Sequence, residues 1–345
     1  MRGARYGLGI LLLAAGVLAA MHAPYRGFAG ETILEIAPGT PSAGIAKLLA
    51  EEGVVRSPWA FLLVRVFRPR AVLQAGDYRF REPASAWEIY RRLSAGDVYY
   101  RELTVREGDN LFDIAASLER LGVIGGEAFL EAARDPAPIR DLAAEAPTLE
   151  GYLFPAVYRL SRRTTAAELC RLMTEKFRTV WNRVGNGGPA HAVVTLASLV
   201  EKETALEEER PLVASVFQNR LRKGMPLDCD PTAIYAALLE GRYRGLIYRS
   251  DLQSRHRYNT YQHAGLPPGP IANPGEASLR AALNPARTDY LFFVAKPDGS
   301  GAHAFSSEID AHARAVTRYR RANANNNQTR PTDGVRGRKT PGANR

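Results

Sequence analysis

The segment Ala197–Thr204 places a carboxylate among apolar side chains, an arrangement that could do acid–base chemistry. At about 100° per residue, Leu199, Val200 and Glu203 share one arc of a helix. Glu201 falls on roughly the opposite side, toward solvent. Burial raises the pKa of a carboxyl because it disfavours the charged form, and a carboxyl protonated near neutral pH can serve as a general acid. Glu203 is therefore the candidate acid, unless it pairs with a buried arginine and only stabilises the fold.

Two further segments carry unusual polar residues, and the second of them suits a sugar-binding cleft. In the first, Asp228 and Asp230 precede a proline and a helix-like run, which is typical of a helix N-cap at Asp230. Asn259 and Tyr261 precede a Pro/Gly-rich loop. A tyrosine ring stacks on the C–H groups of a sugar, and an asparagine offers both a donor and an acceptor. The alternative is a surface loop that proline stiffens.

The N-terminus predicts a membrane anchor. Arg2 and Arg5 precede an apolar run from Gly7 to Met21, which the next two residues extend. Small residues near the end of this run leave a cleaved signal peptide as the alternative. In either case the positive flank stays in the cytoplasm and the body of the protein is exported. We expect residues 1–24 to form an uncleaved transmembrane helix.

A repeated pattern follows the anchor. Residues 36–55 match residues 105–124 at a constant offset of 69 residues. Each copy is typical of a strand, a glycine turn and an amphipathic helix, with Gly39 and Gly108 at the turns. The second copy resembles a LysM-type glycan-binding repeat, and the alternative is a spacer that holds the body off the membrane. We expect residues 25–134 to form one small α+β module with a LysM-like segment.

A larger mixed α+β domain is predicted over residues 140–319, after a Pro- and Ala-rich boundary. Periodicity predicts helices over 166–181, 191–205, 208–223 and 232–239 and a buried strand over 289–295. Asn273 and Glu276 have the spacing of a capping box for a helix over 278–283, so we assign them no chemistry. The tail, residues 320–345, is basic and almost free of apolar side chains, and we expect it to be disordered.

Composition restricts the partners and cofactors. The formal net charge of +10 suits an anionic partner, such as an acidic polymer or a membrane surface. The sequence contains no nucleic-acid-binding motif and no Gly-rich phosphate loop, so no nucleic acid is expected as a partner. Cys170 and Cys229 lack a zinc-ligand pattern, so no metal site is expected. Two ordinary buried thiols are the simplest interpretation, and a disulfide is the alternative.

Several long motifs resemble the YceG-like family of endolytic murein transglycosylases. They are Ala197–Thr204, Val213–Leu221, Asp230–Thr232, Tyr258–Tyr261 and Gly265–Gly269. They follow the family's order, and the resemblance extends from the anchor to about residue 319. It implies a single-pass protein of the inner membrane, with its N-terminus in the cytoplasm and its catalytic domain on the other side. It also implies that the substrate is the glycan strands of peptidoglycan.

The resemblance assigns roles to individual residues. The family's catalytic acid is the second Glu of the Glu-Lys-Glu-Thr motif, here Glu203, in agreement with the helical phase. Asp230, Asn259 and Tyr261 are implied to line the cleft. Such an enzyme cleaves the MurNAc–GlcNAc bond and leaves a 1,6-anhydro-MurNAc end, because the sugar's own C6 hydroxyl attacks in place of water. One carboxylate then suffices, whereas a hydrolase of the usual kind needs two.

The resemblance implies neither a metal nor an organic cofactor. It further implies termination of nascent strands and association with peptidoglycan synthases. Three positions depart from the family pattern: Ala156, Asp228 and the segment Gly301–Phe305. Asp228 adds a carboxylate near the predicted cleft, so it joins the substrate-binding residues and leaves a two-carboxylate muramidase as an alternative. A non-catalytic peptidoglycan-binding scaffold is the other alternative, and a solvated Glu203 or a shallow pocket would favour it.

Overall fold

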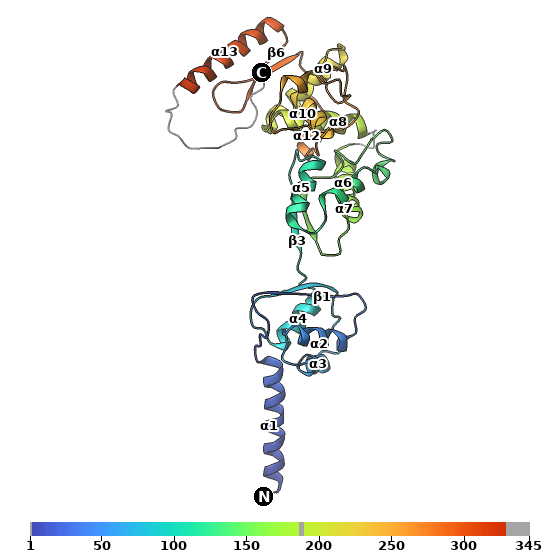
Figure 1. The fold of residues 1–345 in the computed structure, drawn as a ribbon, viewed down its shortest axis with the longest axis vertical. Coiled ribbons are helices and arrows are strands. Elements are labelled where there is room, and N and C mark those ends of the chain that lie inside the picture. The colour runs from blue at the N-terminus through green and yellow to red at the C-terminus, as the bar shows by residue number, and fades with distance from the viewer. Residues whose placement is uncertain (1, 186–189, 329–345) are drawn as a thin grey trace. The chain divides into compact units, whose positions relative to one another are not determined.

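The computed structural model describes residues 2–185 and 190–328. The chain forms two compact units, which are drawn in Figure 1. The first comprises Met1–Glu102 and Arg159–Arg163, and the second comprises Leu103–Tyr158 and Thr164–Arg345. The architecture is mixed α+β and mainly helical, and the described residues contain three two-stranded sheets.

The first unit packs helices on a short antiparallel sheet. Its elements are α1 (Arg2–His22), β1 (Thr32–Ile36), α2 (Ser42–Glu51), α3 (Pro58–Phe67), β2 (Gly76–Phe80) and α4 (Ala86–Ala95). Strands β1 and β2 pair from Thr32 opposite Phe80 to Ile36 opposite Gly76. Alternate strand residues and one face of each helix bury aliphatic and aromatic side chains, Phe61 and Tyr90 among them, in a single core.

Helix α1 runs through the predicted anchor and packs against α3 and α4. Met21, close to its C-terminal end, is buried in the core of the first unit, whereas Leu11, Leu12 and Leu18 are exposed. Residue 1 and the side chains of residues 2–10 and 13 lie outside the described part. Within that part, no helix is both long and apolar enough to cross a membrane. The transmembrane anchor stays a prediction.

The second unit is mainly helical. Its helices are α5 (Leu111–Leu121), α6 (Gly126–Ala133), α7 (Ala166–Val184), α8 (Ala190–Glu203), α9 (Arg210–Arg222), α10 (Asp230–Leu239), α11 (Arg249–Leu252), α12 (Glu276–Leu283) and α13 (Ile309–Gln328), with 3-10 turns η1 (Ala137–Ile139) and η2 (Glu207–Glu209). Strands β5 (Phe292–Ala295) and β6 (His303–Ser306) form an antiparallel hairpin, against which α13 packs. Helix α8 packs against α9, α10 and α12, so its C-terminal end is surrounded by other elements of the unit.

The two copies of the repeat belong to different units, although one module over 25–134 was predicted. Strands β3 (Arg101–Val105) and β4 (Ala156–Leu160) pair with each other, and the division falls within β3. Each copy keeps its predicted local form, because Gly39 and Gly108 have φ of +80° and +79° at the turn between strand and helix. The division follows packing instead: α2 packs against α3, whereas α5 packs against α6.

Most predicted elements of the second unit are confirmed to within a few residues, as α7, α8, α9 and α10. The strand predicted over 289–295 is shorter, and its residues are half-buried rather than buried, because the hairpin is covered by α13 without a larger sheet. The capping box predicted for α12 is wrong: the N-cap is Gly275, which makes no side-chain cap. Both cysteines are buried free thiols, as the simplest interpretation holds.

Helix α13 extends into the tail that was predicted to be disordered. It continues to Gln328, beyond the predicted boundary at residue 320. Residues 321–328 combine one arginine and two alanines, which favour a helix, with four asparagines, which favour it less. The rest of the predicted tail, residues 329–345, lies outside the described residues.

Candidate active site

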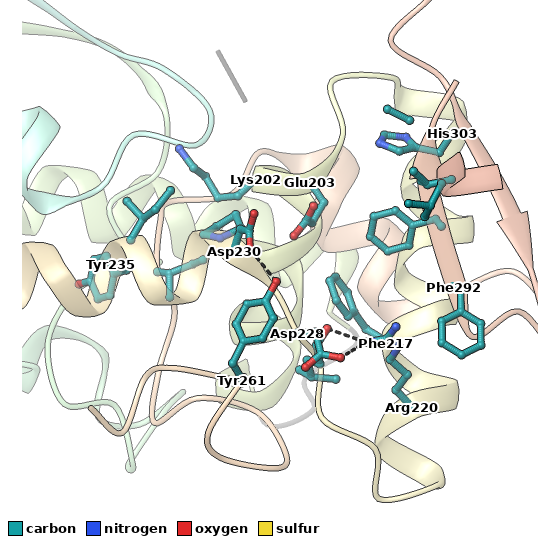
Figure 2. A pocket seen from close by; sticks show the side chains of 18 of the residues that line it. Lys202, Glu203, Phe217, Arg220, Asp228, Asp230, Tyr235, Tyr261, Phe292 and His303 are labelled. Atoms are coloured by element: carbon teal, nitrogen blue, oxygen red, sulfur yellow. Dashed lines mark hydrogen bonds and ion pairs between the residues drawn. The ribbon is translucent and has the colours of Figure 1, made fainter. Parts of the chain in front are cut away.

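Glu203 is the last residue of α8, and its side chain lines a cavity of about 760 Å³ in the second unit. Figure 2 shows the Glu203 carboxyl between Asp230 on one side and His303 on the other. The helix buries Leu199 and Val200, the two residues that share the predicted arc with Glu203. The phase argument therefore placed Glu203 correctly, at the border between the core and the cavity.

The buried ion pair considered for Glu203 belongs to Glu201. The Glu201 carboxylate lies 3.1 Å from the Arg210 guanidinium and accepts a hydrogen bond from the Gly275 amide at 3.0 Å. The Glu201 side chain is only 5% exposed, so the expectation that it faces solvent is wrong. Helices α9 and α12 cover that side of α8, which a single amphipathic helix does not reveal. The structural role thus falls to one glutamate and leaves the other to the cavity.

The pKa of Glu203 is raised to about 7, mainly by burial and in part by the nearby Asp230 carboxylate. The Cys229 thiol, hydrogen-bonded to Glu203, and the Arg220 guanidinium act in the opposite direction. The position of Glu203 at the C-terminal end of α8 also disfavours its charged form, because this end of a helix carries partial negative charge. Glu203 can therefore hold a proton near neutral pH and release it to a group in the cavity.

Asp230 and Tyr261 form a hydrogen-bonded pair in the wall of the same cavity. The Tyr261 hydroxyl donates to the Asp230 carboxylate at 2.6 Å (Figure 2). Asp230 is the first residue of α10 rather than its N-cap, which is Cys229. Burial raises the pKa of Asp230, and the hydrogen bond from Tyr261 lowers it. The cleft role implied for both residues is compatible with this geometry.

Asp228 also lines the cavity and is held by Arg220 of α9. The guanidinium lies 3.2 Å from the Asp228 carboxylate and donates to the carbonyl oxygens of Pro226 and Leu227. Asp228 has φ of +49°, a left-handed conformation that aspartate tolerates better than most residues. Arg220 therefore fixes a bent loop and directs its carboxylate toward the cavity.

Asn259 does not reach the cavity. It is fully buried, and its amide nitrogen donates to the backbone carbonyls of Asp251, Leu252 and Ser254. Its amide oxygen accepts from the Tyr261 backbone N–H at 3.1 Å. The prediction that Asn259 lines the cleft is thus corrected, because all of its hydrogen-bonding capacity folds the loop that carries Tyr261.

His303 is a cavity residue to which the sequence analysis assigned no role. Its Nδ1 lies 2.6 Å from the carboxylate of Glu209, which also accepts the His303 backbone N–H at 2.7 Å. The carboxylate thereby fixes the orientation of the ring. Glu209 precedes α9 and is distant in sequence from His303, so no local spacing could have revealed the pair. Lys202 is a second missed cavity residue, and its ammonium donates to the Gly108 carbonyl at 3.0 Å.

Glu150 is another buried carboxyl of the same unit, away from the cavity lining. It accepts hydrogen bonds from the Leu111 backbone N–H, the Tyr235 hydroxyl and the Asn273 amide at 2.9–3.1 Å. Burial raises the pKa of Glu150 to about 8. Asn273, expected only to cap α12, also accepts from the backbone N–H groups of residues 151 and 153. Glu150 and Asn273 thus join segments that lie far apart in the sequence.

Comparison with known proteins places the chain in a known class. The profile of the YceG-like family matches residues 34–318, and the chain belongs to this family. Among its relatives, the endolytic murein transglycosylase of Bacillus subtilis (strain 168) is 33% identical over 309 residues, covering 83% of this chain and 84% of that protein.

Two further proteins extend the comparison. The endolytic murein transglycosylase of Streptococcus pneumoniae serotype 2 is 29% identical over 75% of this chain, and the match spans 53% of the pneumococcal protein. A 2.6 Å crystal structure of a putative yceG-like protein from Listeria monocytogenes is 29% identical. It superposes with a TM-score of 0.53 and covers 82% of this chain and 98% of that chain.

Proposed function

We propose that this protein is an endolytic lytic transglycosylase that cleaves the MurNAc–GlcNAc bonds of peptidoglycan glycan strands. The observation that carries the proposal is Glu203, a carboxyl with a pKa of about 7 that faces a cavity and is spared the buried ion pair of Glu201. The names of the B. subtilis and S. pneumoniae relatives support the same reaction. A cavity of about 760 Å³ suits part of a glycan strand.

The reaction needs one proton carrier. Glu203, protonated, donates its proton to the glycosidic oxygen as the bond from that oxygen to C1 of MurNAc breaks. The C6 hydroxyl of the same MurNAc bonds to C1, and its proton passes to the Glu203 carboxylate, which restores the acid. The products are a 1,6-anhydro-MurNAc end and a new GlcNAc hydroxyl. Because nucleophile and electrophile belong to one sugar, their proximity replaces the second carboxylate of a hydrolase.

The other cavity residues bind and orient the strand. The Asp230–Tyr261 pair presents a carboxylate and an aromatic ring, which suit sugar hydroxyls and C–H groups. Asp228, held by Arg220, adds a second carboxylate for hydroxyl groups. His303 offers a ring that Glu209 fixes in orientation. The Asp230 carboxylate also helps to keep the proton on Glu203 until the substrate is in place.

The proposal includes a location and partners. Residues 1–24 anchor the protein in the inner membrane, with the N-terminus in the cytoplasm and the second unit outside. The positive flank and the apolar run of the sequence support this topology. Cleavage there terminates the elongation of nascent strands, in association with peptidoglycan synthases. The LysM-like copy, residues 105–124, is a candidate contact for glycan.

A two-carboxylate muramidase is the second candidate. The observation that favours it is that Asp228 and Asp230 share the cavity with Glu203, so that a carboxylate could activate water. Asp228 is paired with Arg220, and Asp230 accepts a hydrogen bond from Tyr261. These partners favour a binding role over base catalysis. The two candidates differ in the mass of the product by one water.

The mass of the product ends tests the proposal. Purified glycan strands without peptide cross-links are digested with the wild-type protein, and the fragments are analysed by liquid chromatography and mass spectrometry. The proposal predicts fragments that end in 1,6-anhydro-MurNAc. Fragments that are one water heavier, with reducing MurNAc ends, would establish the muramidase. Intact strands under all conditions would favour a scaffold without catalytic activity.

A further inference from the structure

Helix α3 of the first unit exposes a large apolar face. Ala60, Phe61 and Val64 are buried against the core, whereas Trp59, Val66 and Phe67 are exposed by 74%, 72% and 62%. Trp59 and Val66 are separated by two helical turns and lie on the same side of the helix. A surface helix normally carries polar residues on its outer side, so an apolar outer side indicates a contact with something else. We call Trp59, Val66 and Phe67 the α3 face.

The segment around the α3 face carries positive charge without compensation. Residues 54–75 contain four arginines, at positions 56, 65, 68 and 70, and no Asp or Glu. Among the described residues, no carboxylate forms an ion pair with any of the four. Arg65 donates to the Ala71 carbonyl and the Tyr90 hydroxyl, and Arg68 lies over the ring of Trp87. The α3 face therefore suits a partner that is apolar and negatively charged.

The position of α3 within the first unit indicates which partner this is. Helix α3 packs against α1, and in Figure 1 it lies at the end of the first unit from which α1 projects. The exposed side chains of α1 include Leu11, Leu12 and Leu18. If α1 enters the bilayer as proposed above, the α3 face lies where the chain leaves the membrane.

We propose that the α3 face docks on the surface of an anionic phospholipid bilayer, next to the point where α1 enters it. This inference rests on the proposed anchoring by α1. Trp59, Val66 and Phe67 enter the boundary between headgroups and acyl chains, the region that tryptophan prefers. The arginines bind the lipid phosphates. Two attachments, α1 and the α3 face, then hold the first unit in one orientation on the membrane.

Quenching of Trp59 fluorescence by brominated lipids tests the proposal. The full chain is reconstituted into vesicles of phosphatidylcholine alone or with phosphatidylglycerol, with bromine near the top of the acyl chains. The protein contains three tryptophans, and the Trp59→Phe variant shows the signal of the other two, so the difference from wild type gives the Trp59 signal. We expect bromine to quench the Trp59 signal, more strongly when phosphatidylglycerol is present. Arg68→Gln or Arg70→Gln should lower the ratio of docked to undocked protein about fivefold each.

Matched controls separate the α3 face from the anchor. Arg91→Gln removes an exposed arginine of α4 and should leave the quenching unchanged. A carbonate wash of the vesicles reports whether α1 anchors the protein. If the protein resists the wash but bromine does not quench Trp59, the α3 docking surface is refuted and the anchor is retained. If Trp59 is quenched but the wash removes the protein, the docking surface is supported and the anchor is refuted. If the protein is washed off and Trp59 is not quenched, the docking surface and the anchor are both refuted.

Discussion

Glu150 and Glu203 are both carboxyls whose pKa burial raises toward or above neutrality, to about 8 and about 7, yet they occupy different settings. Glu150 is enclosed and accepts from three donors, Leu111, Tyr235 and Asn273. Glu203 ends a helix at the wall of a cavity. A raised pKa therefore does not identify the catalytic acid in this fold. What separates the two carboxyls is the cavity, which Glu203 lines and Glu150 does not.

The difference has a structural origin. The donors around Glu150 come from the start of α5, from α10 and from the loop before α12, so this carboxyl joins three parts of the second unit. The carboxyl of Glu203 instead has the Cys229 thiol as a neighbour and the open cavity in front of it. One carboxyl stabilises the scaffold, and the other is free to exchange its proton with a ligand.

Replacement of Glu203 by glutamine should have the largest effect of any single change. Glu203→Gln keeps the shape of the side chain and removes the proton that it donates. General acid–base catalysis typically contributes a factor of about 10²–10⁴, and we expect a loss of cleavage of this size on purified glycan strands. Far-UV circular dichroism should be unchanged. Glu208→Gln, at an exposed position, is the matched control, and substantial activity of Glu203→Gln would refute the assignment.

Replacement of Glu150 by alanine should act on stability instead of chemistry. Glu150→Ala leaves the Leu111 amide, the Tyr235 hydroxyl and the Asn273 amide without their acceptor. We expect a loss of about 3 kcal/mol in the free energy of unfolding, measured in urea. The activity of the fraction that remains folded should be retained. Glu145→Ala, at an exposed site, is the control, and an equally stable Glu150→Ala protein would show that the buried carboxyl has no structural role.

The stability of Glu203→Gln should depend on pH differently from that of the wild type. The folded-state pKa of Glu203, about 7, exceeds its ordinary value of 4.5, so the folded state binds the proton more tightly than the unfolded state. Stability from this group is present below about pH 4.5 and is lost as the pH rises through 7. Relative to wild type, Glu203→Gln should gain about 2 kcal/mol between pH 5 and pH 8.5 in urea unfolding. Glu150 contributes equally to the wild type and to Glu203→Gln, so its effect cancels. If the difference in stability between the two proteins does not change with pH, the raised pKa of Glu203 is contradicted.

Local patterns allowed part of this to be predicted from the sequence. Helical phase placed Glu203 on the arc of Leu199 and Val200, because the apolar arc of α8 is a property of the helix itself, but it wrongly placed Glu201 in solvent. The turns at Gly39 and Gly108 were also predictable, because the need for glycine at a positive φ is local to the chain. The ion pair of Glu201 was not, since Arg210 lies on the next helix and its position depends on how the two helices pack.

The errors concern side chains whose partners are distant in the sequence. Asn259 looked like a ligand for sugar because an exposed asparagine offers a donor and an acceptor, but the backbone of its own loop uses both. Glu150 and the His303–Glu209 pair gave no signal, because nothing near them in the sequence indicates a partner. The division at Glu102 was missed because similarity between two copies reports their local form and not the surfaces on which they pack.

The pH dependence of kcat/KM on purified glycan strands tests the central claim most directly, because it reports the pKa of the essential acid in the free enzyme. We predict that kcat/KM falls as the pH rises above about 7, by about tenfold per pH unit, as Glu203 loses its proton. Glu150→Gln, with its fold verified, should show the same midpoint. A profile that is flat or rising between pH 6 and pH 9, or a midpoint that moves in Glu150→Gln, would contradict the assignment of Glu203 as the catalytic acid.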